Sequence, residues 1–188
     1  MKRLLFAAAL CCASVAHAGL VSGFTGSYAV GNWTSAAGTG SIDTAGAPDA
    51  VVFTSGDDGS GDPAYTSFYI QFARDATVHF SWAYDTTDGE PFYDPFGYLL
   101  ADDLAGLAAG FGQVTDDAGG LGQSGTQLVV VAAGQYFGFE ARSDNTFGAA
   151  TTTVNGLRID EVPEPGSLAL LAVALAAAAT TTRRRRAA

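Results

Sequence analysis

The chain has 188 residues, a formal net charge of −10 and two cysteines, at positions 11 and 12. Between residues 19 and 162 only Arg74, Arg142 and Arg158 stand against eighteen Asp and Glu residues, which gives this middle part a net charge of −15. Such an acidic part disfavours nucleic acid and anionic lipid as partners and favours divalent cations or basic partners. Because it has no cysteine, it also excludes disulfides, cysteine metal ligands and thiol nucleophiles from residues 19–162.

The first eighteen residues have the three parts of a secretory signal peptide. Lys2 and Arg3 form a positive start, an apolar stretch runs from Leu4 to Ala13, and Ala16-His17-Ala18 is a small-x-small cleavage site. We therefore expect a signal helix in residues 1–18, export by the Sec machinery and a mature chain that begins at Gly19.

The other end of the chain predicts a short membrane-stop segment. Val162-Pro163-Glu164-Pro165 precedes an uncharged, transmembrane-like helix over residues 167–182, and Arg183, Arg184, Arg185 and Arg186 follow it. The apolar centre, Leu168 to Ala179, would span only about 18 Å as a helix, against roughly 30 Å for a hydrocarbon core. Its flanking Ser and Thr make it a marginal span, and the arginines would hold its end in the cytoplasm. The body is thus expected outside, after transient anchoring in the inner membrane.

The order of a Val-Pro-Glu-Pro motif, a short hydrophobic helix and a terminal arginine cluster resembles the PEP-CTERM sorting signal of Gram-negative bacteria over residues 162–188. This resemblance implies that an exosortase recognises Pro163-Glu164-Pro165, removes the tail and delivers a secreted or cell-surface protein, often in species that make exopolysaccharide. The two prolines favour an extended, unpaired backbone, which a processing enzyme can grip.

The body, residues 19–161, has the periodicity of β-strands. Every second residue is apolar in Phe68-Ile70-Phe72 and in Val78-Phe80-Trp82-Tyr84. The continuous runs Val51–Phe53 and Leu128–Val131 are typical of strands that are covered on both faces. Further strands are predicted over Phe24–Val30, Phe96–Leu100, Gln135–Arg142 and Ala150–Ile159.

Turn-rich segments separate these strands, for example Ser55–Pro63 and Asp116–Gly125, and only Ala101–Ala109 indicates a helical turn. This pattern predicts an all-β body, an antiparallel, jelly-roll-like β-sandwich. The block formed by Trp82–Gly89 and Tyr93–Tyr98 resembles a motif in the β-sandwich bodies of some other PEP-CTERM proteins. That second resemblance implies a fold and brings no activity with it.

The body has one histidine, His79, which by alternation points away from the face formed by Val78, Phe80 and Trp82. A zinc or copper site needs more His or Cys ligands than this, and a Ser-His-Asp relay would depend on His79 alone. The sequence also has no Walker loop, dinucleotide fingerprint or HExxH motif. Most cofactor-dependent enzyme classes are therefore disfavoured.

Carboxylates gather in two segments of the body, where turn formation is the first interpretation, calcium binding the second and catalysis the third. The residues are Asp57, Asp58 and Asp62 in the first segment, and Asp85, Asp88, Glu90 and Asp94 in the second. Neither segment has the register of an EF-hand or of glycine-rich nonapeptide repeats. Calcium is thus the one cofactor that the composition favours, while two carboxylates would suffice for a glycoside hydrolase.

Aromatic residues near these segments could stack on the apolar faces of sugars, although core packing is the more common use of such rings. They are Trp33, Tyr65, Tyr69, Phe92, Tyr93 and Tyr98. The sequence therefore favours a non-enzymatic, exported β-sandwich protein with an adhesive or polysaccharide-associated role. The alternative is a secreted carbohydrate-active enzyme that uses loop carboxylates.

Overall fold

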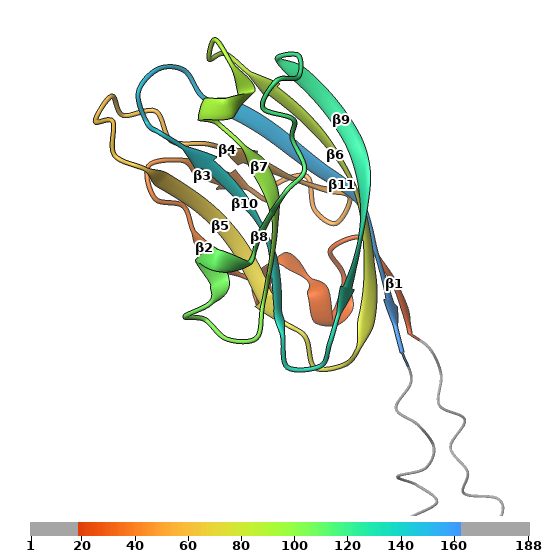
Figure 1. The fold of residues 1–188 in the computed structure, drawn as a ribbon. Helices are drawn as coiled ribbons and strands as arrows, with labels where there is room; N and C mark the ends of the chain where they lie inside the picture. Colours follow the sequence, from red (N-terminus) through yellow and green to blue (C-terminus); the bar gives the residue numbers. More distant parts are fainter. Residues whose placement is uncertain (1–18, 163–188) are drawn as a thin grey trace, which may run out of the picture. The chain divides into compact units, whose positions relative to one another are not determined.

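A computed structural model describes residues 19–162, and the predicted signal helix and hydrophobic tail helix lie outside this part of the chain. The described residues form one unit that contains both sheets and the whole described core (Figure 1). A segment with its own complete core can fold by itself. Within residues 19–162, no helix has the length and apolar character needed to cross a membrane.

Eleven strands form two antiparallel sheets that face each other (Figure 1). The strands are β1 (Leu20–Ser22), β2 (Thr34–Ala36), β3 (Ser41–Asp43), β4 (Ala50–Thr54), β5 (Ala64–Gln71), β6 (Ala76–Thr86), β7 (Phe96–Ala101), β8 (Phe111–Gln113), β9 (Gly122–Val131), β10 (Tyr136–Ser143) and β11 (Ala150–Glu161). The first sheet has the order β3-β4-β11-β6-β9, with β1 added beside β11, and the second has the order β2-β5-β10-β7-β8. From β4 onward, every connection except β7 to β8 crosses between the sheets. The predicted antiparallel β-sandwich is confirmed.

Alternation along the strands builds the core. Val78, Phe80, Trp82 and Tyr84 all point from β6 into the space between the sheets, as the sequence predicted. Aromatic rings fill most of that space: the indole of Trp33 stacks on Phe68 at 4.9 Å and on Phe139 at 5.8 Å between ring centroids. Such aromatic pairs add about 0.5–1.5 kcal/mol each beyond the burial of their area.

The predicted strand over Phe24–Val30 is wrong. Two 3-10 turns, η1 (Gly26–Tyr28) and η2 (Val30–Asn32), occupy this segment instead. Gly23 and Gly26 adopt positive φ angles of 67° and 57°, and a Cβ on Gly23 would lie 2.6 Å from the carbonyl oxygen of Pro48. Phe24 and Tyr28 are both buried, so the apolar residues of this segment pack into the core from turns and not from a strand.

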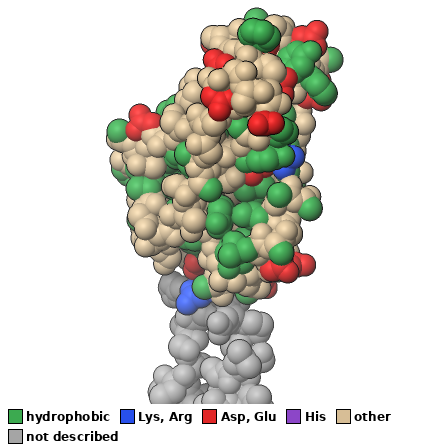
Figure 2. Space-filling view, turned by 90° about the vertical axis from the view of Figure 1, so that its left-hand side faces the viewer, with side chains coloured by type: hydrophobic (Ala, Val, Ile, Leu, Met, Phe, Trp, Pro, Cys, Tyr) green, Lys and Arg blue, Asp and Glu red, His purple; other side chains and the backbone are tan. Residues whose placement is uncertain are grey.

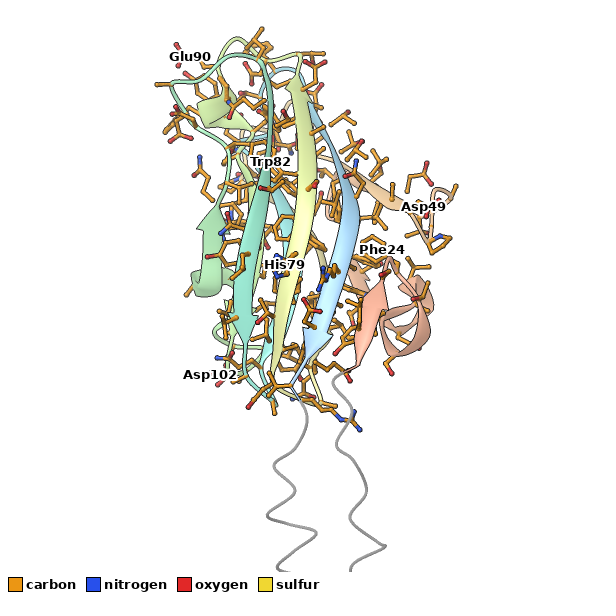
Figure 3. All side chains as sticks on the ribbon, turned by 90° about the vertical axis from the view of Figure 1, so that its right-hand side faces the viewer. Phe24, Asp49, His79, Trp82, Glu90 and Asp102 are labelled. Carbon is orange, nitrogen blue, oxygen red and sulfur yellow. The ribbon has the colours of Figure 1, made fainter. Side chains whose placement is uncertain are left out.

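The expectation that both faces of Leu128–Val131 are covered is also wrong. In β9 Val129 and Val131 are buried, whereas Leu128 is 53 % exposed and Val130 is 67 % exposed. The reason is position, because β9 is the outermost strand of the first sheet and no described layer packs on its outer face (Figure 3). In β4, the run Val51–Phe53 buries its first and last residues and leaves Val52 half-buried.

Both ends of the described chain lie at one end of the sandwich. β1 pairs with the end of β11, the Gly19 carbonyl accepts a hydrogen bond of 2.9 Å from the Glu161 amide, and the Val162 amide donates to the Asp75 carbonyl at 2.8 Å. The twelve residues of β11 extend over roughly 36 Å at about 3.3 Å per residue. The loop that carries Glu90 lies at the opposite end (Figure 3).

Truncation of Phe139 tests how much the aromatic core contributes to stability. Phe139 is fully buried and contacts the rings of Phe53, Phe80 and Phe137. We expect Phe139→Ala to lower the free energy of unfolding of residues 19–162 by about 3–5 kcal/mol in a denaturant titration, because it leaves a cavity. The matched control is Phe147→Ala at a side chain that is 79 % exposed, with an expected change within about 0.5 kcal/mol. Equal losses in the two variants would contradict this description of the core.

Candidate functional site

A groove of about 270 Å³ lies at the end of the sandwich opposite Gly19 and Val162. It is lined by Pro63, Tyr65, Phe92, Tyr93, Pro95, Arg142, Ser143 and Asp144. The exposed fractions of Tyr65, Phe92 and Tyr93 are 47 %, 58 % and 38 %. Within residues 19–162, Phe147 is the one other aromatic side chain with comparable exposure. Exposed rings therefore concentrate at one concave place.

Arg142 forms the polar centre of this groove. Its Nε donates to Glu140 Oε1 at 2.7 Å, and its Nη2 donates to the Ala108 carbonyl at 2.8 Å. The guanidinium carbon lies 3.8 Å from the ring centroid of Phe111 and 5.4 Å from that of Tyr65, within the range of cation–π attraction. Since a guanidinium has five N–H donors, donors remain for a ligand.

The partner carboxylate of Arg142 is itself held in place. Glu140 is 3 % exposed, and its Oε2 accepts a hydrogen bond of 2.6 Å from Ser67 Oγ on the neighbouring strand β5. Both oxygens of this carboxylate therefore have a partner, as a buried charge requires. Glu140 and Phe111 thus hold the Arg142 guanidinium group in place at the groove.

The short helix η3 (Pro91–Tyr93) supplies two of the three rings. Proline at its first position has a backbone angle that suits a helix start. The Tyr93 carbonyl accepts a hydrogen bond of 3.1 Å from the Asp144 amide, and the Pro95 carbonyl accepts one of 2.9 Å from the Arg142 amide. These two hydrogen bonds thus join η3 and the residues after it to the end of β10.

Asp94 anchors η3 from inside the sandwich. Its side chain is 1 % exposed, and it accepts hydrogen bonds from Ser55 Oγ at 2.8 Å and from Thr86 Oγ1 at 3.2 Å. Ser55 Oγ in turn accepts from the Ala150 amide at 2.8 Å. Burial raises the pKa of Asp94 above its ordinary value, although its hydroxyl partners oppose that shift. Asp94 positions the groove and does not line it.

A second hollow of about 400 Å³ adjoins the groove at Phe92, which lines both. Its other lining residues are Gly89, Glu90, Pro91, Asp117, Ala118 and Gly119. Figure 2 shows acidic and hydrophobic side chains mixed at this end of the sandwich. The exposed ring of Phe92 therefore lies between the two hollows.

The predicted sugar-stacking residues divide into two groups. Tyr65, Phe92 and Tyr93 come together in the groove. The other three do not line it. Trp33 is in the core. Tyr98 and Tyr69 are half-buried; Tyr98 stacks on Phe137 with 6.5 Å between ring centroids, and Tyr69 meets Tyr136 edge-on at 6.2 Å. Arg142 was not predicted to bind a ligand, although it is one of only three basic side chains, apart from His79, among residues 19–162, which could have indicated such a role.

The four carboxylates of the second acidic segment do not converge. Asp94 is buried, Asp85 is exposed on β6, Asp88 is half-buried with its amide bonded to Thr86 Oγ1 at 3.0 Å, and Glu90 is exposed beside η3. Within residues 19–162, no group of three or more His, Asp or Glu side chains is arranged to hold a metal ion.

In the first acidic segment, Asp57 and Asp62 are exposed, and Asp58 accepts hydrogen bonds from the Ser60 amide at 2.9 Å and from the Asn145 side chain. The hydrogen bonds from Ser60 lower the pKa of Asp58. These contacts are those of a turn. Calcium binding at either segment stays a prediction, which a higher melting temperature in calcium than in chelator would support.

His79 lies on β6 with its side chain directed to the outer face (Figure 3), opposite Leu128 and Arg158 on the neighbouring strands. Its Nε2 is 3.8 Å from Asp160 Oδ2. The predicted orientation of this residue is therefore correct. Of the predicted processing residues, Gly19 and Val162 are described; Ala16, Ala18, Pro163, Glu164, Pro165 and the four arginines lie outside the described part.

Comparison with known protein families gives one match, at residues 161–186, to the PEP-CTERM protein-sorting motif. The chain carries this sorting motif. The motif indicates a secreted or cell-surface protein, in agreement with the resemblance noted in the sequence. No curated protein matches the chain.

Several solved structures are similar to this chain at low identity. The K1 adhesin domain of Lys-gingipain from Porphyromonas gingivalis has 12 % identity and a TM-score of 0.41, over 77 % of this chain and 99 % of that one. The N-terminal cellulose-binding domain of β-1,4-glucanase C from Cellulomonas fimi has 11 % identity and a TM-score of 0.39, over 71 % and 90 %. The C-terminal CBM6 of a laminarinase from Zobellia galactanivorans has 14 % identity and a TM-score of 0.34, over 76 % and 100 %.

The raised pKa of Asp94 predicts a specific dependence of stability on pH. An acid whose pKa is higher in the folded state stabilises the fold below its unfolded pKa, and this contribution is lost as the pH rises through the folded pKa. We expect the free energy of unfolding of the wild type, minus that of Asp94→Asn, to fall as the pH rises above the ordinary value of 3.8. Denaturant titrations of both proteins at several pH values measure this difference.

Asp49→Asn, at an exposed carboxylate, controls for the loss of one negative charge. A difference between wild type and Asp94→Asn that stays constant with pH, or that grows as the pH rises, would contradict the assignment of a raised pKa.

Proposed function

We propose that this protein is exported to the cell surface or the extracellular matrix and binds polysaccharide, without catalysis, in the groove formed by Tyr65, Phe92, Tyr93 and Arg142. The observation that carries the proposal is the convergence of exposed rings around a fixed guanidinium group. Sugars present apolar C–H faces and many hydroxyl groups, so a binding site needs flat apolar surfaces and a few oriented polar groups.

The groove has both kinds of surface. Tyr65 and Phe92 offer ring faces with large exposed areas, and the rings of Phe92 and Tyr93 meet edge-on at 5.4 Å, which fixes their relative orientation. Arg142 offers planar donors that are already oriented by Glu140 and Phe111. A preorganised site loses little conformational entropy when it binds.

The charges around the groove favour an uncharged polysaccharide. Asp144 lines the groove, Glu90 and Asp117 line the adjoining hollow, and the whole body carries many more acidic than basic residues. The summed negative potential repels uronic acids and sulfated sugars, and one arginine already paired with Glu140 does not reverse it. Uncharged polysaccharides are the ligand class that we expect.

The position of the groove suits a surface protein. Gly19 and Val162 leave the sandwich at one end, and the loop of η3 lies at the other (Figures 1 and 3). The groove therefore lies at the end of the sandwich opposite Val162, from which the C-terminal tail continues. We infer that Sec exports the chain, that its tail anchors it transiently in the inner membrane, and that an exosortase processes it at Pro163-Glu164-Pro165.

The positions of Asp94 and Asp85 support a role without catalysis. Acid–base hydrolysis of a glycoside needs two carboxyl groups on either side of the bound sugar bond. Asp94 is buried below the groove with its oxygens bonded to hydroxyls, and Asp85 is exposed on the first sheet. Polysaccharide turnover that disappears in Asp88→Asn or Glu90→Gln would favour the enzyme instead.

Single ring deletions test this proposal. We screen residues 19–162 against an array of uncharged and charged glycans, and measure the best uncharged glycan by calorimetry. Tyr65→Ala and Phe92→Ala should each lower the affinity about tenfold or more, equivalent to ~1.4 kcal/mol or more. Phe147→Ala is the matched control, because Phe147 is an exposed ring that does not line the groove, and its affinity should equal that of the wild type.

Circular dichroism of each variant verifies that the sandwich is intact. No binding to any glycan by a folded wild-type protein, or equal affinity in the wild type and the Tyr65→Ala and Phe92→Ala variants, would overturn the proposal.

A further inference from the structure

Gly19 and Glu161 lie beside each other where β1 meets the end of β11. The Glu161 amide donates a hydrogen bond of 2.9 Å to the Gly19 carbonyl, one step beyond the pair formed by Leu20 and Asp160. A Cβ on Gly19 would lie 3.1 Å from Glu161 Oε2. Since the Gly19 nitrogen and such a Cβ are bonded to the same Cα and lie about 2.5 Å apart, the nitrogen is at most about 5.6 Å from this carboxylate oxygen.

The Glu161 carboxylate is largely buried and has two partners in the body. Its Oε1 accepts a hydrogen bond of 3.0 Å from the Tyr28 hydroxyl, and its Oε2 lies 3.2 Å from Arg74 Nη1. The side chain of Glu161 is 16 % exposed, whereas that of Arg74 is 53 % exposed. Burial and the bond to Glu161 raise the pKa of Tyr28, so this hydroxyl stays a donor. Because an ionised carboxylate has about four acceptor positions, Glu161 can accept a further donor.

The charge of the Gly19 nitrogen depends on processing. While Ala18 is attached, this nitrogen belongs to a neutral amide. Hydrolysis of that peptide bond gives a carboxylate on Ala18 and an α-amino group on Gly19, which is protonated below a pKa of about 7.7–8.0. An opposite charge within roughly 4–6 Å favours the protonated form. Arg74 repels the new cation, but water screens its half-exposed guanidinium group.

We propose that removal of residues 1–18 gives Gly19 an α-ammonium group that pairs with the Glu161 carboxylate and holds β1 against β11. The proposal rests on the cleavage before Gly19 that is part of the proposed function. β1 has three residues and pairs with β11 alone, and the ends of a chain fray unless they are held. The processed body is therefore more stable than the same body with its first nitrogen still in an amide.

Two neighbouring carboxylates have partners elsewhere. Asp75 accepts a hydrogen bond of 2.7 Å from the Ala133 amide. Asp160 lies 3.0 Å from Arg158 Nη2, and alternation along β11 directs it to the face opposite that of Glu161. Glu161 is thus the carboxylate that we expect to raise the pKa of the new amine.

The pKa of the amine tests the pairing directly. Residues 19–162 contain no lysine, so the α-amino group of Gly19 is the one primary amine in this part of the chain. We measure its pKa by NMR titration of residues 19–162, produced with Gly19 as the first residue, in the folded state and in denaturant. The pKa in the folded state should be higher by about half a unit or more.

Selective acetylation of the amine tests its effect on stability. A group whose pKa is raised in the folded state stabilises the fold below its unfolded pKa, and this contribution is lost as the pH rises through the folded pKa. The folding equilibrium constant of the free-amine protein, divided by that of the acetylated protein, should therefore fall about threefold between about pH 6 and pH 9.5, which is equivalent to half a unit of pKa. Denaturant titrations of both forms measure this ratio.

Two variants identify the partner of the amine. Glu161→Gln should abolish the fall of the ratio, whereas Asp160→Asn, the matched control that removes the neighbouring carboxylate, should retain it. An amine with the same pKa in folded and unfolded wild type, a ratio that does not change with pH, or equal falls in the two variants would overturn the proposal. The native N-terminus is read by mass spectrometry and glycan binding is measured separately, so failure of the ion pair, of the cleavage and of the groove are distinguishable.

Discussion

The architecture of this protein depends on the pairing of β11 with three other strands. This strand pairs with β6 along its length, with β4 over its first half and with β1 near its end, so it lies at the centre of the first sheet. At its end it brings Gly19 and Val162 together, and at its start the Ala150 amide bonds to Ser55, which holds Asp94. One strand thus connects the end where the chain enters and leaves with the end where the groove lies. The pairing of β11 therefore places the two ends of the described chain far from the groove that we propose binds polysaccharide.

Most of the β-sandwich could be predicted from the sequence, because alternation is a direct consequence of a sheet with one buried face. β6 is the clearest example: its predicted inward residues are all buried. The error at Leu128–Val131 arises because an apolar run in the sequence does not show what covers the two faces of a strand. Leu128 and Val130 belong to an apolar run typical of a buried strand, yet they lie at the edge of the sheet. The three-residue strands β2, β3 and β8 are too short to show any period.

The groove could be predicted only in part. The residue types that suit sugar binding were recognisable, and Tyr65, Phe92 and Tyr93 were among them. Which rings face solvent depends on long-range contacts that one sequence does not display. Trp33 has the same chemistry but fills the space between the sheets. Asp94 looks like a loop carboxylate in the sequence, and its burial follows from Ser55, thirty-nine residues earlier, which donates a hydrogen bond to it. The sequence therefore shows which residue types can bind a sugar, but the fold determines which of them are exposed to do so.

Every inference about outward-facing partners depends on export of residues 19–162 as the mature part of the chain. Mass spectrometry of the protein from separated fractions of native cells reads both termini and the location together. We expect a chain that begins at Gly19, lacks the four terminal arginines and occurs in the surface or extracellular fraction. Recovery of the intact chain in the cytoplasm, with residues 1–18 and Arg183–Arg186 still present, would contradict it.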